Sequence, residues 1–155
     1  MNYEERVQRA ISYFKSGYNC SQSVVAAFAD IYGFTEEQAL KMSSSFGGGI
    51  GRMRQTCGAA CGMFILAGLE TGSTDGKDNS QKSYNYQVVQ QLAQKFKEIN
   101  GSIICSELLG LEKPSDDNQP QAAERTDTYY KKRPCVMMVE TAARIFAEFL
   151  QSKVS

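Results

Sequence analysis

Apolar residues recur at helical spacing along almost the whole chain, and no stretch alternates apolar and polar residues as a strand does. Intervals of three and four residues place these side chains on one face of a helix. Such faces are formed by Tyr3, Val7, Ile11 and Phe14, by Val24, Phe28 and Ile31, by Val88, Leu92, Phe96 and Ile99, and by Val139, Ala143, Phe146 and Leu150. The sequence therefore predicts an all-α fold.

The segments between these faces carry helix start and stop signals. Thr35 with Gln38 forms a capping box, and the Asn100-Gly101 pair is typical of a helix C-terminus. The glycine-rich run at 46–56 interrupts the helical pattern. No linker divides the 155 residues, and a chain of that length can bury one sizeable core. We expect one domain over residues 1–155, a bundle of about five to seven helices.

Charge and hydropathy argue against several classes of partner. Lys plus Arg total 17 and Asp plus Glu total 17, so the formal net charge is zero and no nucleic-acid partner is expected. The first ten residues are polar and of mixed charge, unlike a signal peptide. The longest apolar stretch, residues 63–69, is too short to cross a bilayer. We expect a cytoplasmic protein without membrane insertion.

Cysteine is the residue type that carries chemistry in this chain. There is no His, which excludes Ser-His-Asp and Cys-His catalytic pairs and every site with a His ligand. There are five cysteines, and this odd number indicates reduced thiols and not a disulfide framework. A metal bound through side chains would then be held by thiolates, with or without carboxylates. The paired acids Asp116-Asp117 are interpreted as solvated loop residues.

Four of the five cysteines stand at predicted helix starts. They are Cys20 after Asn19, Cys57 after Thr56, Cys105 opening the segment 105–109, and Cys135 after Pro134. A helix N-terminus favours thiolate over thiol, as do the cations at Arg52, Arg54 and 131–133. The alternative is that these cysteines are small buried hydrophobes. Cys61 lies one helical turn after Cys57 and is interpreted as a packing residue.

The glycine run at 47–51 matches neither the dinucleotide-binding nor the P-loop pattern. Glycines allow close backbone approach and positive φ, so the run either wraps a cofactor or makes a tight corner. For the first alternative, Gly48, Gly49 and Gly58 are the cofactor-binding candidates, because their backbone N–H groups would approach the Cys57 sulfur.

Taken together, five segments resemble a known family. They are NCSQSV at 19–24, FGGGIGR at 46–52, TCGAACG at 56–62, CSELLG at 105–110, and Cys135. They resemble the bacterial and archaeal redox-active family named for its C…GCAxxG…C…C cysteine pattern, over about Cys20 to Leu150. The motif reads C-G-A-x-x-G here, and Cys61 occupies a variable x position. The resemblance implies a redox role through Cys20, Cys57, Cys105 and Cys135, without defining a substrate.

Three hypotheses follow for the function. In the first, the four cysteines converge on one site that binds an iron–sulfur cluster or zinc, in an oxidoreductase or electron carrier with a redox partner. In the second, the same cysteines form reversible disulfides without a metal. In the third, the chain is a helical interaction module, for example a homodimer, in which the cysteines are structural.

Overall fold

The fold is built from helices, as the spacing of apolar residues in the sequence predicts. The computed structural model describes residues 1–126 and 134–153. Within these ranges the chain is all-α, as predicted, with an isolated antiparallel β-bridge in place of any sheet. The α-helices are α1 (Tyr3–Lys15), α2 (Cys20–Ala26), α3 (Glu36–Ser43), α4 (Gly58–Thr71), α5 (Asn79–Asn100), α6 (Cys105–Leu108) and α8 (Cys135–Lys153). Single 3-10 turns are η1 (Ala29–Tyr32), η2 (Ser44–Phe46) and η3 (Pro114–Asp117).

Local hydrogen bonds fix the helix ends that the sequence predicts. The Asn19 side chain accepts from the Gln22 N–H, and the Gln22 side chain accepts from the Asn19 N–H, so α2 begins at a capping box. Thr35 and Gln38 form the same arrangement before α3. α5 ends at Gly101, whose φ of 91° lies in the left-handed region.

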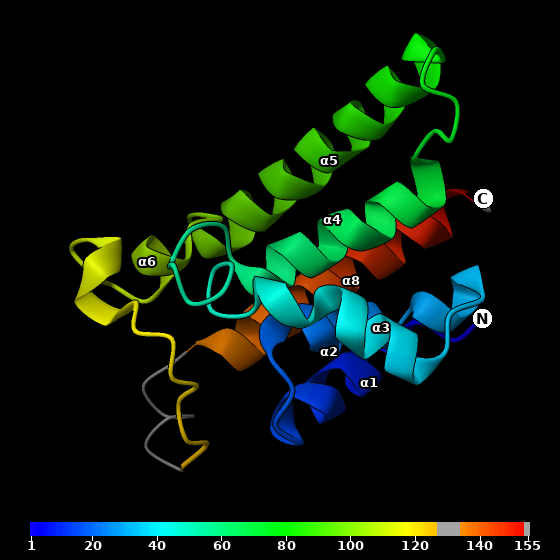
Figure 1. Cartoon of the computed structure of the whole chain (residues 1–155). Helices are drawn as coiled ribbons and strands as arrows, with labels where there is room; N and C mark the ends of the chain where they lie inside the picture. The colour runs from blue at the N-terminus through cyan, green and yellow to red at the C-terminus, as the bar shows by residue number, and fades with distance from the viewer. Residues whose placement is uncertain (127–133, 154–155) are drawn as a thin grey trace.

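The core lies between α2, α4 and α8, with α1 packed on α8 and α5 on the outer side of α4 and α8 (Figure 1). Phe28 and Phe146 meet edge to face at its centre, with ring centroids 5.2 Å apart. Phe28 follows the end of α2 by two residues, so this contact links α8, which carries Cys135, to the chain just after α2, which carries Cys20.

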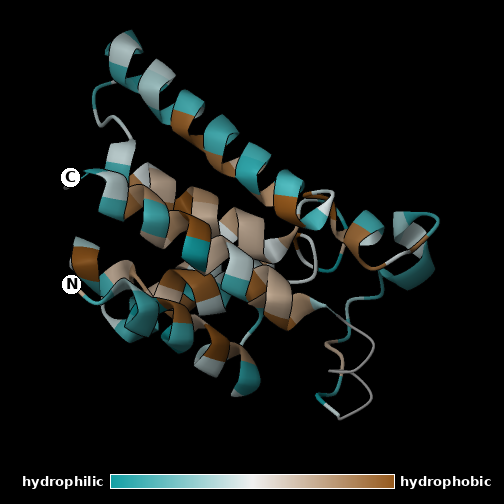
Figure 2. Cartoon of the chain, turned by 180° about the vertical axis from the view of Figure 1, so that it is seen from behind, coloured by the Kyte–Doolittle hydropathy of each residue, from teal (hydrophilic) through white to brown (hydrophobic). Residues whose placement is uncertain are grey.

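α5 covers the core with one narrow face. Val88, Leu92 and Phe96 are buried as predicted, whereas most other positions along α5 are hydrophilic (Figure 2). Ile99 was expected on the same face, but it is 64% exposed. Its exposure means that no neighbouring element of the described chain covers this face in the last turn of the helix.

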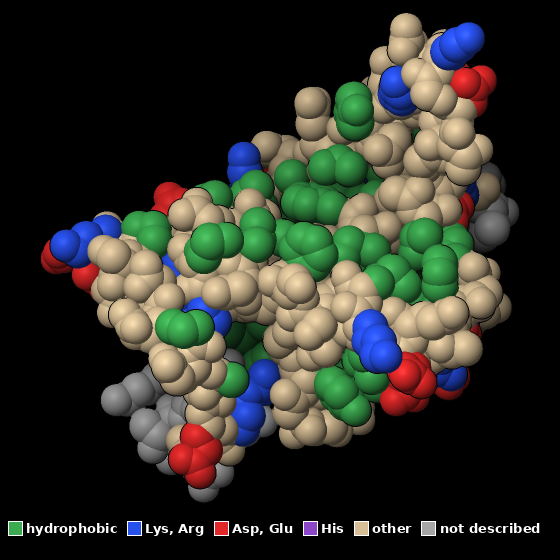
Figure 3. Space-filling model, in the orientation of Figure 1, with side chains coloured by type: hydrophobic (Ala, Val, Ile, Leu, Met, Phe, Trp, Pro, Cys, Tyr) green, Lys and Arg blue, Asp and Glu red, His purple; other side chains and the backbone are tan. Residues whose placement is uncertain are grey.

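Hydrophobic side chains are also visible at the surface over α4 and α5 (Figure 3). Phe64, Ile65 and Leu69 of α4 are only partly buried. None of the helices in the described ranges has the length and apolar character that crossing a membrane requires.

An irregular loop before α4 determines where the site forms. The β-bridge pairs Thr56 with Ile104. The Cys57 N–H donates to the Ile103 carbonyl and the Cys105 N–H to the Gln55 carbonyl, each over 2.6 Å. Two segments about fifty residues apart in sequence are thereby held side by side, just before α4 and α6.

Candidate functional site

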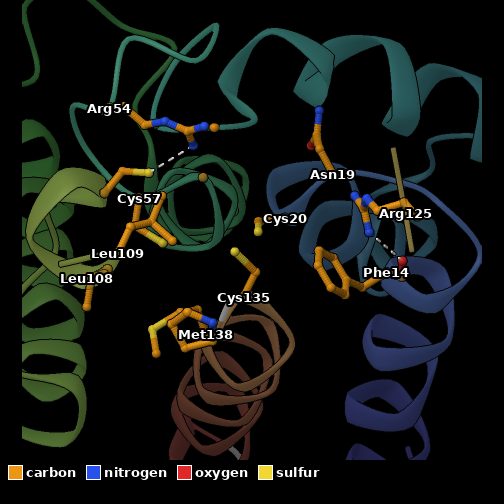
Figure 4. A pocket seen from close by; sticks show the side chains of 15 residues that line it. Phe14, Asn19, Cys20, Arg54, Cys57, Leu108, Leu109, Arg125, Cys135 and Met138 are labelled. Atoms are coloured by element: carbon orange, nitrogen blue, oxygen red, sulfur yellow. Dashed lines mark hydrogen bonds between the residues drawn. The ribbon is translucent and has the colours of Figure 1, made fainter. Parts of the chain in front are cut away.

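The four cysteines at predicted helix starts line one cavity of about 60 Å³ (Figure 4). Cys20 comes from α2, Cys57 from the loop before α4, Cys105 from α6 and Cys135 from α8. Sequence alone could not establish this convergence, because the four lie in separate elements. Cys61 does not line the cavity; its sulfur is 3.7 Å from the Thr56 carbonyl oxygen, in agreement with a packing role.

Each of these cysteines lies at a helix start. Cys20, Cys105 and Cys135 are the first residues of their helices. Cys57 is the N-cap of α4, so this helix begins one residue later than the Thr56 cap predicted. The basic residues 131–133 before Cys135 lie outside the described residues.

Cys20 and Cys135 form a pair within the cavity. Their thiols share a hydrogen bond, and Figure 4 shows the two sulfur atoms facing each other. This hydrogen bond, followed by burial, raises the pKa of Cys20 well above its ordinary value. Cys135 is the less buried of the two, since Cys20 is 9% exposed and Cys135 falls in the intermediate range.

Cys57 and Cys105 follow directly after the two bridge residues, Thr56 and Ile104. Burial raises the pKa of Cys57 to about 12, against the smaller opposing effect of hydrogen bonds from the Ala60 and Ala59 N–H groups. The start of α4 therefore acts on the thiol in the predicted direction, but burial outweighs it. At neutral pH we expect Cys57 to be a thiol.

Arg54 is a cation that contacts a cavity sulfur. It was predicted to act on Cys57, but its Nη1 donates to the Sγ of Cys105 over 3.6 Å. The side chain is only 4% exposed. Its Nε donates to the Asp117 carbonyl oxygen over 2.6 Å and its Nη2 to Asp117 Oδ2 over 2.9 Å.

Sequence reasoning missed two residues of this site. Asp117 was interpreted as solvated, whereas its carboxylate bridges Arg52 and Arg54. Arg125 lines the cavity, stacks on the Phe14 ring at 4.3 Å and donates to the Phe14 carbonyl oxygen. No short sequence motif predicts either role, because both residues belong to the polar connector between α6 and α8.

Gly48, Gly49 and Gly58 line the cavity as well. A Cβ on Gly49 would lie 2.6 Å from the Cys105 Cβ, and one on Gly58 would lie 2.8 Å from the Phe46 carbonyl oxygen. Close packing of the loop on the cysteines therefore accounts for glycine at both positions. Their role in approaching a cofactor stays a prediction.

The metal hypothesis depends on how the four thiols are placed. Across the described residues, no group of three or more Cys, Asp or Glu side chains is placed to hold a metal ion. Four thiols are a suitable donor set for zinc or an iron–sulfur cluster, but the sulfurs would have to move to hold a metal ion. Metal binding stays a prediction.

Alkylation rates should report the burial of Cys57. A pKa of about 12 in place of 9.0 leaves about a thousandfold less thiolate at pH 8. We expect iodoacetamide to label Cys57 at least about a thousandfold more slowly in the folded protein than in urea, as read by peptide mass spectrometry. Equal rates in the two conditions would contradict the burial of this thiol.

Comparison with known proteins gives one match. The family described as "Putative redox-active protein (C_GCAxxG_C_C)" matches residues 18–149. This range includes all four cavity cysteines. No curated protein and no solved structure matches the chain.

Proposed function

The chain belongs to the C_GCAxxG_C_C family, and from this premise we propose that its cavity carries out reversible thiol–disulfide chemistry, with Cys20 and Cys135 as the redox couple. The hydrogen bond between these two thiols, whose sulfur atoms face each other in one cavity, is the observation that supports the assignment (Figure 4). A disulfide requires these two sulfur atoms to approach to about 2 Å. Both lie at helix starts, where backbone N–H groups favour the thiolate that must form during exchange, although the hydrogen bond and burial outweigh this effect at Cys20.

The exchange requires a partner that carries a disulfide. A thiolate of the couple attacks one sulfur of the partner disulfide, which forms a mixed disulfide and releases a partner thiolate. The second cysteine then loses its proton and attacks the mixed disulfide. Cys20 and Cys135 end as a disulfide, and the partner, reduced by two electrons, takes up the two protons. The reverse sequence reduces the protein.

A direct test is oxidation followed by disulfide mapping. After treatment with a small-molecule disulfide, denaturation and alkylation, we expect a Cys20–Cys135 cross-link with a mass loss of two hydrogens. Cys20→Ser and Cys135→Ser should each abolish it, whereas Cys61→Ser, also a buried cysteine but outside the cavity, should not. Five alkylated cysteines under every oxidising condition would overturn the proposal.

Metal and sulfide analysis distinguishes the metal-bound alternative from the thiol–disulfide proposal. Iron, zinc and acid-labile sulfide are measured in anaerobically purified protein, with an absorption spectrum. On the thiol–disulfide proposal we expect no stoichiometric metal. Stoichiometric metal that is lost in the Cys57→Ser variant would replace this proposal by a cysteine-ligated centre.

A further inference from the structure

Beyond the Cys20–Cys135 couple, we propose that Arg54, held in place by Asp117, makes Cys105 the most nucleophilic thiol of the cavity. Arg54 is here a positioning residue, because it acts through the sulfur that it contacts. Its guanidinium reaches Cys105 Sγ at 3.6 Å and is almost entirely buried. A hydrogen bond from a cation strengthens when the sulfur becomes negative, so this contact favours the thiolate.

Charges around the cavity support the same conclusion. Arg54 and Arg125 line it, and no Asp or Glu is among the lining residues in the described ranges. Asp117 lies behind Arg54 and is shared with Arg52, at 2.9 Å to each guanidinium. Of these two guanidinium groups, that of Arg54 reaches the Cys105 sulfur. A Cys105 thiolate would be stabilised by this guanidinium in a water-poor environment.

The backbone holds Arg54 in an uncommon conformation. Its φ is 60°, in the left-handed region that costs a residue with a side chain about 1–2 kcal/mol. Its N–H donates to the Gly48 carbonyl and its own carbonyl accepts from the Ser106 N–H, directly after Cys105. Together with the two bonds to Asp117, these contacts fix the guanidinium against the sulfur. Strain of this kind concentrates at functional sites.

The role of the Cys105 thiolate in disulfide exchange rests on the proposed function. The Cys105 thiolate would attack one sulfur of the Cys20–Cys135 disulfide, so that one S–S bond forms and one breaks. The displaced thiolate takes the proton that Cys105 gave up. The thiolate itself is testable without that couple, so the two proposals can fail separately.

The test measures alkylation of Cys105 against pH, by peptide mass spectrometry, in a Cys20→Ser background and in the unchanged chain. Arg54→Gln removes the charge, and we expect the rate at pH 7.5 to fall about tenfold and the half-maximal pH to rise. Arg54→Lys should retain more of the rate than Arg54→Gln. Arg52→Gln is the matched control, since Arg52 binds Asp117 and the carbonyls of Gln119 and Gln121. In this variant the rate of Cys105 alkylation should stay within about twofold of the rate in the unchanged chain.

Circular dichroism establishes that each variant is folded. A merely structural role for Arg54 would loosen the site and speed alkylation of Cys105, which is 8% exposed. An unchanged or faster rate in folded Arg54→Gln would therefore overturn the proposal. If that variant does not fold, the unchanged chain decides the question. Cys105 must be alkylated at lower pH than the other three cavity cysteines, and any other order overturns the proposal.

Discussion

Replacing Gly49 by alanine is expected to destabilise the protein by about 2–5 kcal/mol, from left-handed strain together with overpacking. The φ of Gly49 is 73°, which an L-residue adopts at a cost. The added methyl carbon would lie 2.6 Å from the Cys105 Cβ and 2.8 Å from the Arg54 Cα. Neither neighbour can move away cheaply, since the first belongs to a cavity cysteine and the second to the backbone.

Substitutions at two other glycines separate the cost of left-handed strain from the cost of overpacking. At Gly101 φ is 91° and nothing lies within 4 Å of an added Cβ, so Gly101→Ala should cost only the strain, about 1 kcal/mol. Gly68 lies inside α4 with open space and no positive φ, and Gly68→Ala should be neutral or stabilising by up to about 1 kcal/mol.

Urea unfolding at pH 7 ranks the three variants by their free energy of unfolding. We expect Gly49→Ala to be the least stable and Gly68→Ala the most stable. Equal effects of Gly49→Ala and Gly101→Ala would show that contact with Cys105 contributes nothing. In that event the loop does not pack on the site as described.

Much of the fold could be predicted from the sequence, because helices carry local signals. The spacing of apolar residues and the caps at Asn19, Thr35 and Gly101 depend on residues within a turn or two of each other. Ile99 shows the limit of this reasoning. Its spacing from Phe96 suits a core position, but whether a neighbour covers that position is a property of the tertiary packing.

The candidate site could be predicted only in part. Helix-start signals singled out the four cavity cysteines and set Cys61 apart. The protonation state of these cysteines could not be predicted, because helix ends depend on local sequence whereas burial depends on the whole fold. Burial raises the pKa of Cys57 to about 12 despite its two backbone hydrogen bonds. The link between Arg54 and Asp117 joins residues 63 positions apart, and no local pattern encodes it.

Oxidation should stabilise the folded protein strongly if Cys20 and Cys135 are the couple. The disulfide would join α2 to α8 and close a loop of more than a hundred residues. In the chain-entropy model, closing a loop of that size contributes about 4–5 kcal/mol by restricting the unfolded chain. For a domain of this size, that corresponds to a rise in Tm of roughly 8–20 °C.

Thermal unfolding of oxidised and reduced protein, followed by circular dichroism, measures this difference. Cys20→Ser is the matched control, because it cannot form the cross-link but keeps Cys57 and Cys105; its oxidised and reduced forms should melt together. A difference that persists in Cys20→Ser would assign the stabilising disulfide to another pair, of which Cys57 and Cys105 are the nearest candidates because the Thr56–Ile104 bridge holds them side by side. Equal melting of the two forms of the unchanged chain would mean that strain in the folded state cancels the entropic gain, and would count against a couple preorganised by its hydrogen bond.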